Sequence, residues 1–444
     1  MLKAVAPDWH PPLSTESEEA AGFYLEGLHR HLSILPAVGR SFDNAFKHDP
    51  TFGVGAAALA VAASGVGEVE LARQALQAAR TAAPKAPAMS RSHIHAVDAL
   101  LTLPTTRALA VAGKHLASFP HDVFILAMTL QSLHSSGRRT RRQEALAFLD
   151  AAVRTGVEHF AVPSLRSVIV ADVGAIDEAR ADAEAGLAAN PRSAHAAHGL
   201  AHVFYETGDH EVGRDWLSTW TADFDPRASG VHLSWHLALH DLALGDVAGL
   251  LARYARSIRP HSSSSLYVDA TDILWRSRLS GVAVKEQFAA LRIIVPAVGD
   301  VRSTSLAIMQ SVVVLAGDCD ADGLRAAVRL LEASKPAVYR DAVLPIARAL
   351  QAIVEGKLEV AVTQLASVDG ELVALAGSNA QLDLVSQTLL WCYQQLGVVP
   401  PAEVFLVARV SAGSPARATG EVPRRVGRFR RLVRTPAGQG GLGF

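Results

Sequence analysis

The sequence predicts an all-α protein in which pairs of helices stack into a superhelical solenoid. Three observations predict this fold. Alanine and leucine dominate, and no alternating run of valine, isoleucine and threonine marks a strand. Prolines recur at a regular interval, and two pairs of histidines stand at an equal offset. At 444 residues the chain is too long for one compact core, whereas a stack can grow by repetition.

The prolines mark the expected junctions between repeats. They fall 34 to 36 residues apart in two series: Pro50, Pro84 and Pro120, and then Pro191, Pro226, Pro260 and Pro296. Proline cannot continue a helix interior, so each should follow the end of a helix pair. Glycines that turn the first helix into the second stand inside the pairs, at Gly208, Gly245, Gly317 and Gly356. Because 34 residues is the period of the tetratricopeptide repeat, we expect a tetratricopeptide-like α-α superhelix of degenerate repeats.

Three segments follow from the composition. Residues 1–13 are expected to form an extended N-terminal lead, and Ser14 and Thr15 to cap the first helix ahead of an acidic first turn. Residues 14–410 form the repeat solenoid, with roughly 20 helices. Between Pro120 and Pro191 the proline interval is lost, so residues 138–165 are expected to hold an irregular loop or a distorted repeat. Residues 411–444 form a basic, partly disordered tail with seven arginines against one acid.

Composition argues against several classes of protein. The net charge of −1 gives no general attraction to nucleic acid or to an anionic membrane. Phe429 is the aromatic residue among the tail arginines, so we interpret them as a solvated surface rather than an RNA-binding patch. The first residues lack the apolar core of a signal peptide, and no stretch is apolar enough to span a bilayer. Two cysteines, Cys319 and Cys392, fit a reducing compartment, so we expect a cytoplasmic protein.

The candidate chemistry lies in residues 193–246. His198 and His202 are four residues apart, as are His232 and His236, so each pair lies on one helical face; the two pairs are 34 residues apart. We expect the four imidazoles to form one cluster, because successive first helices of a solenoid lie side by side at about 8–10 Å. Asp269, 37 residues after His232, falls near the same repeat phase and is a candidate carboxylate partner.

Three interpretations of these histidines stay open. As metal ligands, His198, His202, His232 and His236 could bind a divalent cation such as zinc, iron or nickel. As a polar site, the cluster could bind a small ligand or act as general acid and base, with His202, His236 and Asp269 as the candidate catalytic residues. As packing residues, the imidazoles would hydrogen-bond within a polar seam. His93, His95 and His134 stand alone and are interpreted as structural.

Two shorter motifs have a binding and a structural interpretation each. In GSNAQLD, residues 377–383, the side chains of Asn379, Gln381 and Asp383 could bind a polar ligand, or Ser378 or Asn379 could simply cap the next helix. The run DCDADG at 318–323 resembles the start of a calcium loop. Its twelfth position is Arg329 rather than glutamate, so we interpret it as a turn that caps a helix.

Together the motifs resemble the tetratricopeptide repeat protein 38 family. That pattern has a histidine pair after Asn-Pro, a second pair in an H-x-x-WH segment, and a GSNAQ-x-D stretch, here at 198–202, 232–236 and 377–383. The resemblance covers most of residues 10–410 and implies a helical-repeat fold rather than a particular reaction. The chain departs from the family at 305–308, where members tend to have an Asp/His pair and this chain reads SLAI. If that pair completes a family site, the departure implies a changed or lost activity.

The sequence therefore predicts a repeat protein that binds a small polar ligand or a peptide on its concave surface. The expected ligand-binding residues are His198, His202, His232, His236, Asp269, Asn379, Gln381 and Asp383. Whether the protein is an enzyme stays open. One alternative is a metal- or histidine-dependent hydrolase or lyase on the same scaffold, and another is a purely structural scaffold for protein partners. A divalent metal is the candidate cofactor.

Overall fold

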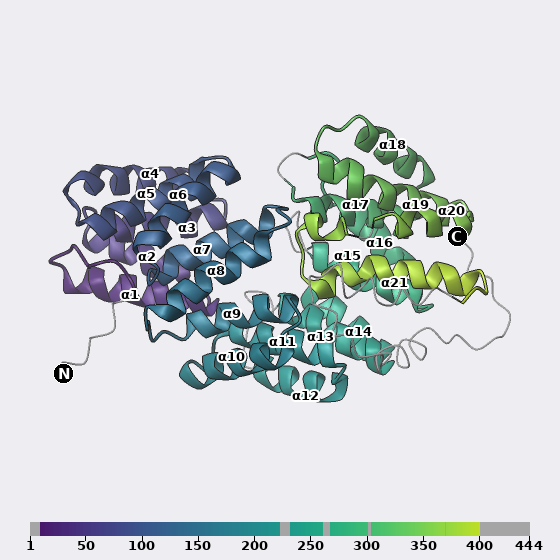
Figure 1. Cartoon of the computed structure of the whole chain (residues 1–444), viewed down its shortest axis with the longest axis horizontal. Helices are drawn as coiled ribbons and strands as arrows, with labels where there is room; N and C mark the ends of the chain where they lie inside the picture. Colours follow the sequence, from purple (N-terminus) through teal and green to yellow (C-terminus); the bar gives the residue numbers. More distant parts are fainter. Residues whose placement is uncertain (1–8, 223–230, 261–266, 301–302, 369, 400–444) are drawn as a thin grey trace. The chain divides into compact units, whose positions relative to one another are not determined.

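The computed structural model describes residues 9–222, 231–260, 267–300, 303–368 and 370–399 (Figure 1). In these residues all regular structure is helical, comprising 21 α-helices and four short 3₁₀ or π segments, without a strand. The all-α prediction is therefore confirmed. The basic tail predicted at 411–444 and most of the N-terminal lead lie outside the described residues.

The chain forms two compact units, and unit 1 comprises Met1–Ser136, Thr140–Val170 and Asp177–Leu200. Its helices are α1 (Glu18–Ser33), α2 (Val38–His48), α3 (Gly53–Gly65), α4 (Val69–Ala82), α5 (Ala88–Thr102), α6 (Thr105–Ser118), α7 (Val123–Ser135), α8 (Arg141–Arg154), most of α9 (Ala161–Asp172), α10 (Ile176–Ala189) and the start of α11 (Ala194–Thr207), with a 3₁₀ turn, η1 (Ala83–Lys85). α1 packs on α2, α3 on α4, α5 on α6 and α7 on α8, and α3 packs on α5 and α5 on α7. This is the stacking of a helical repeat.

Unit 2 comprises Gly137–Arg139, Ala171–Ile176 and Ala201–Phe444. Its helices are the rest of α11, α12 (His210–Thr221), α13 (Val231–Leu244), α14 (Val247–Arg253), η2 (Tyr254–Ile258), α15 (Tyr267–Leu279), α16 (Lys285–Arg292), α17 (Ser305–Gly317), α18 (Ala321–Glu332), η3 (Tyr339–Val343), α19 (Leu344–Val354), α20 (Leu358–Ala366), η4 (Leu372–Leu375) and α21 (Asn379–Gln395). The first helices of successive pairs contact each other, α13 with α15, α15 with α17 and α17 with α19, while α21 packs against α15 and α20.

The proline and glycine signals mark the connections they predicted, with one exception. Every proline of the two series that the structure describes lies between helix pairs. Gly208, Gly245 and Gly356 adopt the left-handed φ values of 76°, 77° and 72° that a sharp turn requires. Gly317 instead ends α17, and Cys319 takes the left-handed position with φ 59°. Glycine is needed at 317 because a Cβ there would lie 2.4 Å from the Phe288 ring.

Two local expectations are wrong. The first helix is capped by Ser17, whose side chain accepts from the N–H of Ala20, whereas Thr15 donates to Asp49 at 2.6 Å. Residues 138–165 hold the regular helix α8 and the start of α9 rather than an irregular loop. The proline interval fails there because the α8–α9 connection ends without a proline, not because the repeat is broken. The helix-capping interpretation of 318–323 is confirmed, since Asp320 accepts from the N–H of Gly323 at the start of α18.

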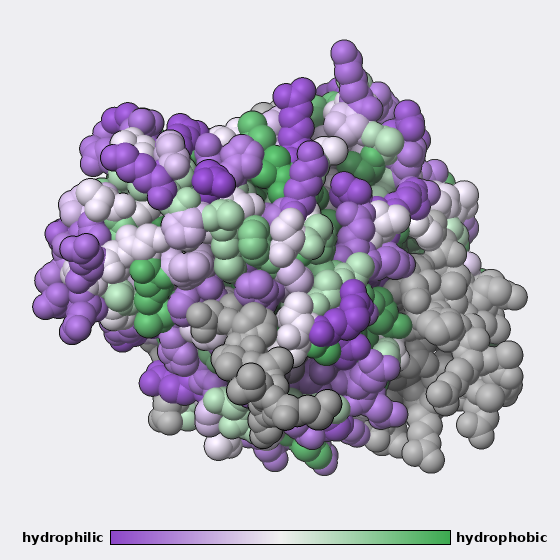
Figure 2. Space-filling model, turned by 60° about the vertical axis from the view of Figure 1, so that its left-hand side comes forward, coloured by the Kyte–Doolittle hydropathy of each residue, from purple (hydrophilic) through white to green (hydrophobic). Residues whose placement is uncertain are grey.

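Each unit has a hydrophobic core of its own. In unit 1 the largest fully buried side chains include Tyr24, Phe42 and Phe124, and in unit 2 they include Trp235 and Trp275. On the face drawn in Figure 2, hydrophilic residues are interspersed with hydrophobic ones. Among the described residues, no helix combines the length and the apolar character needed to cross a membrane.

Candidate functional site

Four helices of unit 2 bring together motifs that are far apart in the sequence. α11 contributes His202 and Tyr205; α13 contributes His232, Trp235 and His236; α15 contributes Asp269, Asp272 and Arg276; and α21 contributes Gln381 and Asp383. The first three are the first helices of consecutive pairs, so residues at equivalent repeat positions meet. We call this set the histidine site.

The imidazoles of the histidine site pack edge to face. The ring centres of His202 and His236 are 4.8 Å apart, and those of His232 and His236 are 5.0 Å apart. The Trp235 ring stacks on His232 at 5.0 Å with an interplanar angle of 17°. His202 and His236 are fully buried, whereas the His232 side chain keeps 34% of its exposure. His232 is therefore the imidazole of this site that a ligand in solvent can reach.

A buried carboxylate orients His232. Its Nδ1 lies 2.9 Å from Oδ2 of Asp269, and because a carboxylate only accepts, this nitrogen carries the proton. Burial lowers the pKa of His232, but the charge of Asp269 and its hydrogen bond outweigh that effect and leave this pKa above its usual value. Asp269 also lies 3.5 Å from the Nε2 donor of Gln381. The pairing of His232 with Asp269 thus follows the repeat phase from which it was predicted.

A second, fully buried layer supports this pair. Trp235 donates its indole N–H to Oδ1 of Asp272 at 2.9 Å, and Arg276 donates to both oxygens of that carboxylate at 2.7 and 3.2 Å. Arg276 also donates to the carbonyl of Ala380 at 2.5 Å. Burial lowers the pKa of Arg276, but the charge of Asp272 outweighs this effect and leaves that pKa above its usual value. Burial raises the pKa of Asp272, and the charge of Arg276 offsets only part of that rise. This layer fixes the Trp235 ring on which His232 stacks.

The GSNAQLD motif is mainly structural. Ser378 caps α21 in a capping box with Gln381, which confirms the capping interpretation. Asn379 does not cap. Its backbone N–H and its side chain both donate to Asp172. Asp383 accepts from the Tyr205 hydroxyl at 2.9 Å. Of the three residues proposed for ligand binding, Gln381 is the one with a described contact to the His232–Asp269 pair.

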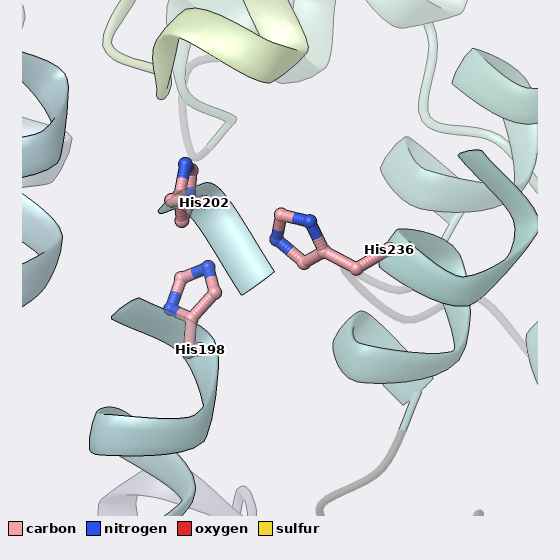
Figure 3. A group of neighbouring side chains, drawn as sticks. All are labelled: His198, His202 and His236. Carbon is pink, nitrogen blue, oxygen red and sulfur yellow. The ribbon is translucent and has the colours of Figure 1, made fainter. Parts of the chain in front are cut away.

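His198 lies one helical turn before His202 on α11. Figure 3 shows the imidazoles of His198, His202 and His236 directed toward one another, and one ring nitrogen from each lies within 4.8 Å of the others. Such a group has the donor type and spread that a divalent transition metal accepts. His232, the fourth metal ligand expected from the sequence, is hydrogen-bonded to Asp269 instead.

His202 and His236 should be energetically coupled. Both rings are buried and in contact, so replacing one by alanine changes the surroundings of the other. We expect the free-energy losses of His202→Ala and His236→Ala to be non-additive by about 0.5–3 kcal/mol in a double-mutant cycle followed by chemical denaturation. A control cycle of His202 with Arg325, which pairs with Asp322 and Glu355, should be additive. Zero coupling between the two histidines would remove the basis for a shared site.

Sequence reasoning missed the supporting layer, although a signal for it exists. Asp272 lies 37 residues after Trp235, the same offset that links His232 to Asp269. It also missed a second polar cluster, in unit 1, where His93, His115 and Asp122 meet. No sequence period links those residues, since they lie on the two helices of one pair and at the start of the next.

No family model matches the sequence. The chain is similar to the crystal structure of the P58(IPK) TPR domain, with 15% sequence identity, covering 85% of this chain and 98% of that chain at a TM-score of 0.21. A TM-score this low carries no argument about the fold or about a ligand. The stacked helix pairs of each unit themselves make this an all-α helical-repeat protein.

Proposed function

We propose that this helical-repeat protein binds a small polar ligand at the histidine site, with His232 as the residue that contacts it. The observation that carries the proposal is the partly exposed imidazole held by a buried carboxylate: His232 is 34% exposed and Asp269 10%. A side chain that only packs the core has no need of such an orienting partner, whereas catalytic and ligand-binding histidines commonly have one.

The chemistry of His232 indicates the class of ligand. With its pKa raised by Asp269, the imidazole is protonated in a larger fraction of molecules near neutral pH and offers an N–H to an oxygen acceptor. A carboxylate or phosphate oxygen is the best acceptor for a protonated imidazole. The ligand proposed is therefore a small molecule that carries one of these groups.

The convergence of the motifs also supports membership of the tetratricopeptide repeat protein 38 family. The three motifs that carry the resemblance lie on three separate helices, α11, α13 and α21. His202 packs against His236, and Gln381 lies against Asp269, the partner of His232. A resemblance confined to helix packing would not favour polar groups that meet in one place. At 305–308, where members of that family tend to have an Asp/His pair, this chain has the start of α17 with the buried apolar side chains Leu306 and Ile308.

The test is a thermal-shift and calorimetry panel of small carboxylates and phosphates. A binding compound should raise the melting temperature of the wild-type protein, and His232→Gln should abolish that rise while leaving the protein folded. His48→Gln is the matched control, because His48 lies on α2 of unit 1, where its ring lies against Phe23. Compounds that stabilise wild type and His232→Gln equally would count against the proposal.

Catalysis on the same scaffold is a second candidate, and a specific observation favours it. A histidine whose Nδ1 donates to a buried carboxylate is the arrangement that acts as a general base in many hydrolases. In that case Asp269→Asn should reduce turnover far more than it reduces ligand affinity. A scaffold that only binds protein partners would instead tolerate both Asp269→Asn and His232→Gln without loss of partner binding.

A further inference from the structure

Unit 1 contains a second cluster of metal-binding side chains, apart from the histidine site. His93 lies on α5, His115 on α6, and Asp122 is the N-cap of α7. Oδ2 of Asp122 lies 2.7 Å from Nδ1 of His93 and 3.1 Å from Nε2 of His115. All three side chains are buried, with exposures of 0%, 2% and 0%. The two histidines thus each direct one ring nitrogen, and the N-cap of α7 one carboxylate oxygen, toward a common point.

We propose that His93, His115 and Asp122 bind a divalent transition metal of the zinc class. Two imidazoles and one carboxylate are a common ligand set for such ions, at about 2.0–2.2 Å from the metal. In a tetrahedral site the ligand atoms would be somewhat farther apart than the 2.7 and 3.1 Å seen here. A small outward rotation of the rings would therefore bring the ligand atoms to the separation that the ion needs.

Metal binding requires a proton to move on each ring. Without a metal, Nδ1 of His93 and Nε2 of His115 donate to Asp122, because a carboxylate only accepts. Metal binding needs those two nitrogens as lone-pair donors, so each proton moves to the other nitrogen of its ring. For His115 that nitrogen, Nδ1, lies 2.9 Å from the hydroxyl of Ser92, which can accept the proton's hydrogen bond. Ser92 is thus a positioning residue of the kind that metal-binding histidines usually have.

Two buried polar atoms beside the cluster form no hydrogen bond to any residue that the structure describes. They are the hydroxyl of Tyr24 and Nε2 of His93, and both side chains are fully buried. Burial, and next to it the charge of Asp122, raises the pKa of Tyr24, so the hydroxyl lies within the electrostatic reach of that carboxylate. Buried polar groups are normally satisfied, so these two atoms mark a place where the described residues leave a polar partner missing.

The competing explanation is purely structural. Asp122 Oδ1 accepts from the N–H of Ile125 at the start of α7, and the two histidines could serve only to satisfy the other oxygen of this cap. Such a cap would make the stability of the protein indifferent to metal ions and chelators. The two explanations therefore separate in an experiment on the full-length chain.

The experiment uses untagged protein treated with a chelator and then titrated with Zn²⁺ or Co²⁺. We expect one equivalent of Zn²⁺ to raise the melting temperature, and Co²⁺ to give the visible absorption of a tetrahedral site. His115→Gln should abolish both effects, and Ser92→Ala, at a residue outside the ligand set, should weaken Zn²⁺ affinity by about 10–100-fold with the fold intact. His236→Gln, in unit 2, should leave this site unaffected.

Each outcome is decisive. The proposal is overturned if neither Zn²⁺ nor the chelator changes the melting temperature of the wild-type protein. It is also overturned if folded His115→Gln binds Zn²⁺ as the wild type does. If His115→Gln fails to fold, Ser92→Ala decides, since an unchanged affinity in that variant contradicts the assigned role of Nδ1. Loss of Zn²⁺ binding in His236→Gln alone would place the metal in unit 2 instead. None of these results depends on whether His232 binds a small ligand.

Discussion

Replacing Asp272 with alanine should lower the free energy of unfolding by about 3–5 kcal/mol, the usual loss when one partner of a buried ion pair is removed. Asp272 is fully inaccessible and accepts from Trp235 and twice from Arg276. Without it, the Arg276 guanidinium is left in an interior where its remaining acceptors are neutral, the carbonyl of Ala380 and the hydroxyl of Tyr205. The uncompensated charge, rather than the lost bonds alone, makes the effect large.

Tryptophan fluorescence during urea denaturation measures this loss. Five of the six tryptophans lie in unit 2, so the signal reports the unit that contains the pair. Asp322→Ala is the matched control, because Asp322 pairs with Arg325 at 2.6 Å but is 94% exposed, and such pairs contribute about 0–1 kcal/mol. The double variant Asp272→Leu, Arg276→Met should recover part of the loss, since it buries no charge. Equal, small losses for Asp272→Ala and Asp322→Ala would contradict this account.

The fold could be predicted because its signals are local and repeated. A proline ends a helix pair and a left-handed glycine turns one helix into the next, whatever the rest of the chain does. Where the local signal is absent, at 155–160, the prediction failed although helices α8 and α9 are regular. The first cap was misplaced for a related reason: Ser14, Thr15 and Ser17 are all good caps, and only the tertiary contact of Thr15 with Asp49 decides between them.

The site could be predicted only as far as the repeat period reaches. Equal offsets link first helices to first helices, which is how His202, His236 and Asp269 were brought together. The repeat period could not predict the cluster in unit 1. His93 and His115 lie on the two helices of one pair, so their spacing of 22 residues depends on the length of the connection between those helices. Residues grouped across a pair become visible only in three dimensions.

Mild acid should destabilise unit 1. Burial lowers the pKa of His31 to about 4; burial and then His31 lower that of His195 to about 4. Burial, followed by the neighbouring His29 and His10, lowers the pKa of His159 to about 4 as well. The physical cause is visible in the packing, since His31 lies against Phe124 and His159 against Trp9 and Phe160. All of these residues belong to unit 1.

The direction of this pH effect follows from the difference in proton binding between the unfolded and the folded chain. In the unfolded chain each of these histidines binds a proton near pH 6.5, whereas in the folded chain each binds one only near pH 4. Their contribution to stability is therefore complete above pH 6.5 and is lost as the pH falls toward 4. Each group loses about 1.4 kcal/mol per pH unit in that window, so three together can cost up to about 4 kcal/mol near pH 5.5. In unit 2, burial and then the neighbouring His210 lower the pKa of His240 to about 3.

Peptide-level hydrogen–deuterium exchange tests whether mild acid destabilises unit 1, once the rates are corrected for the pH dependence of intrinsic exchange. Between about pH 7.5 and 5.5, peptides of α1 and α9 should lose more protection than peptides of α17 and α19. In His31→Gln the amide cannot titrate, so the loss should be smaller by about 1.4 kcal/mol per pH unit. His232 opposes the trend, because its raised pKa adds stability that is present below pH 6.5 and lost as the pH rises through the folded value. Equal protection of the α1 and α9 peptides at both pH values would mean that these imidazoles are hydrated in the native state, and the pH sensitivity assigned to unit 1 would then have no physical basis.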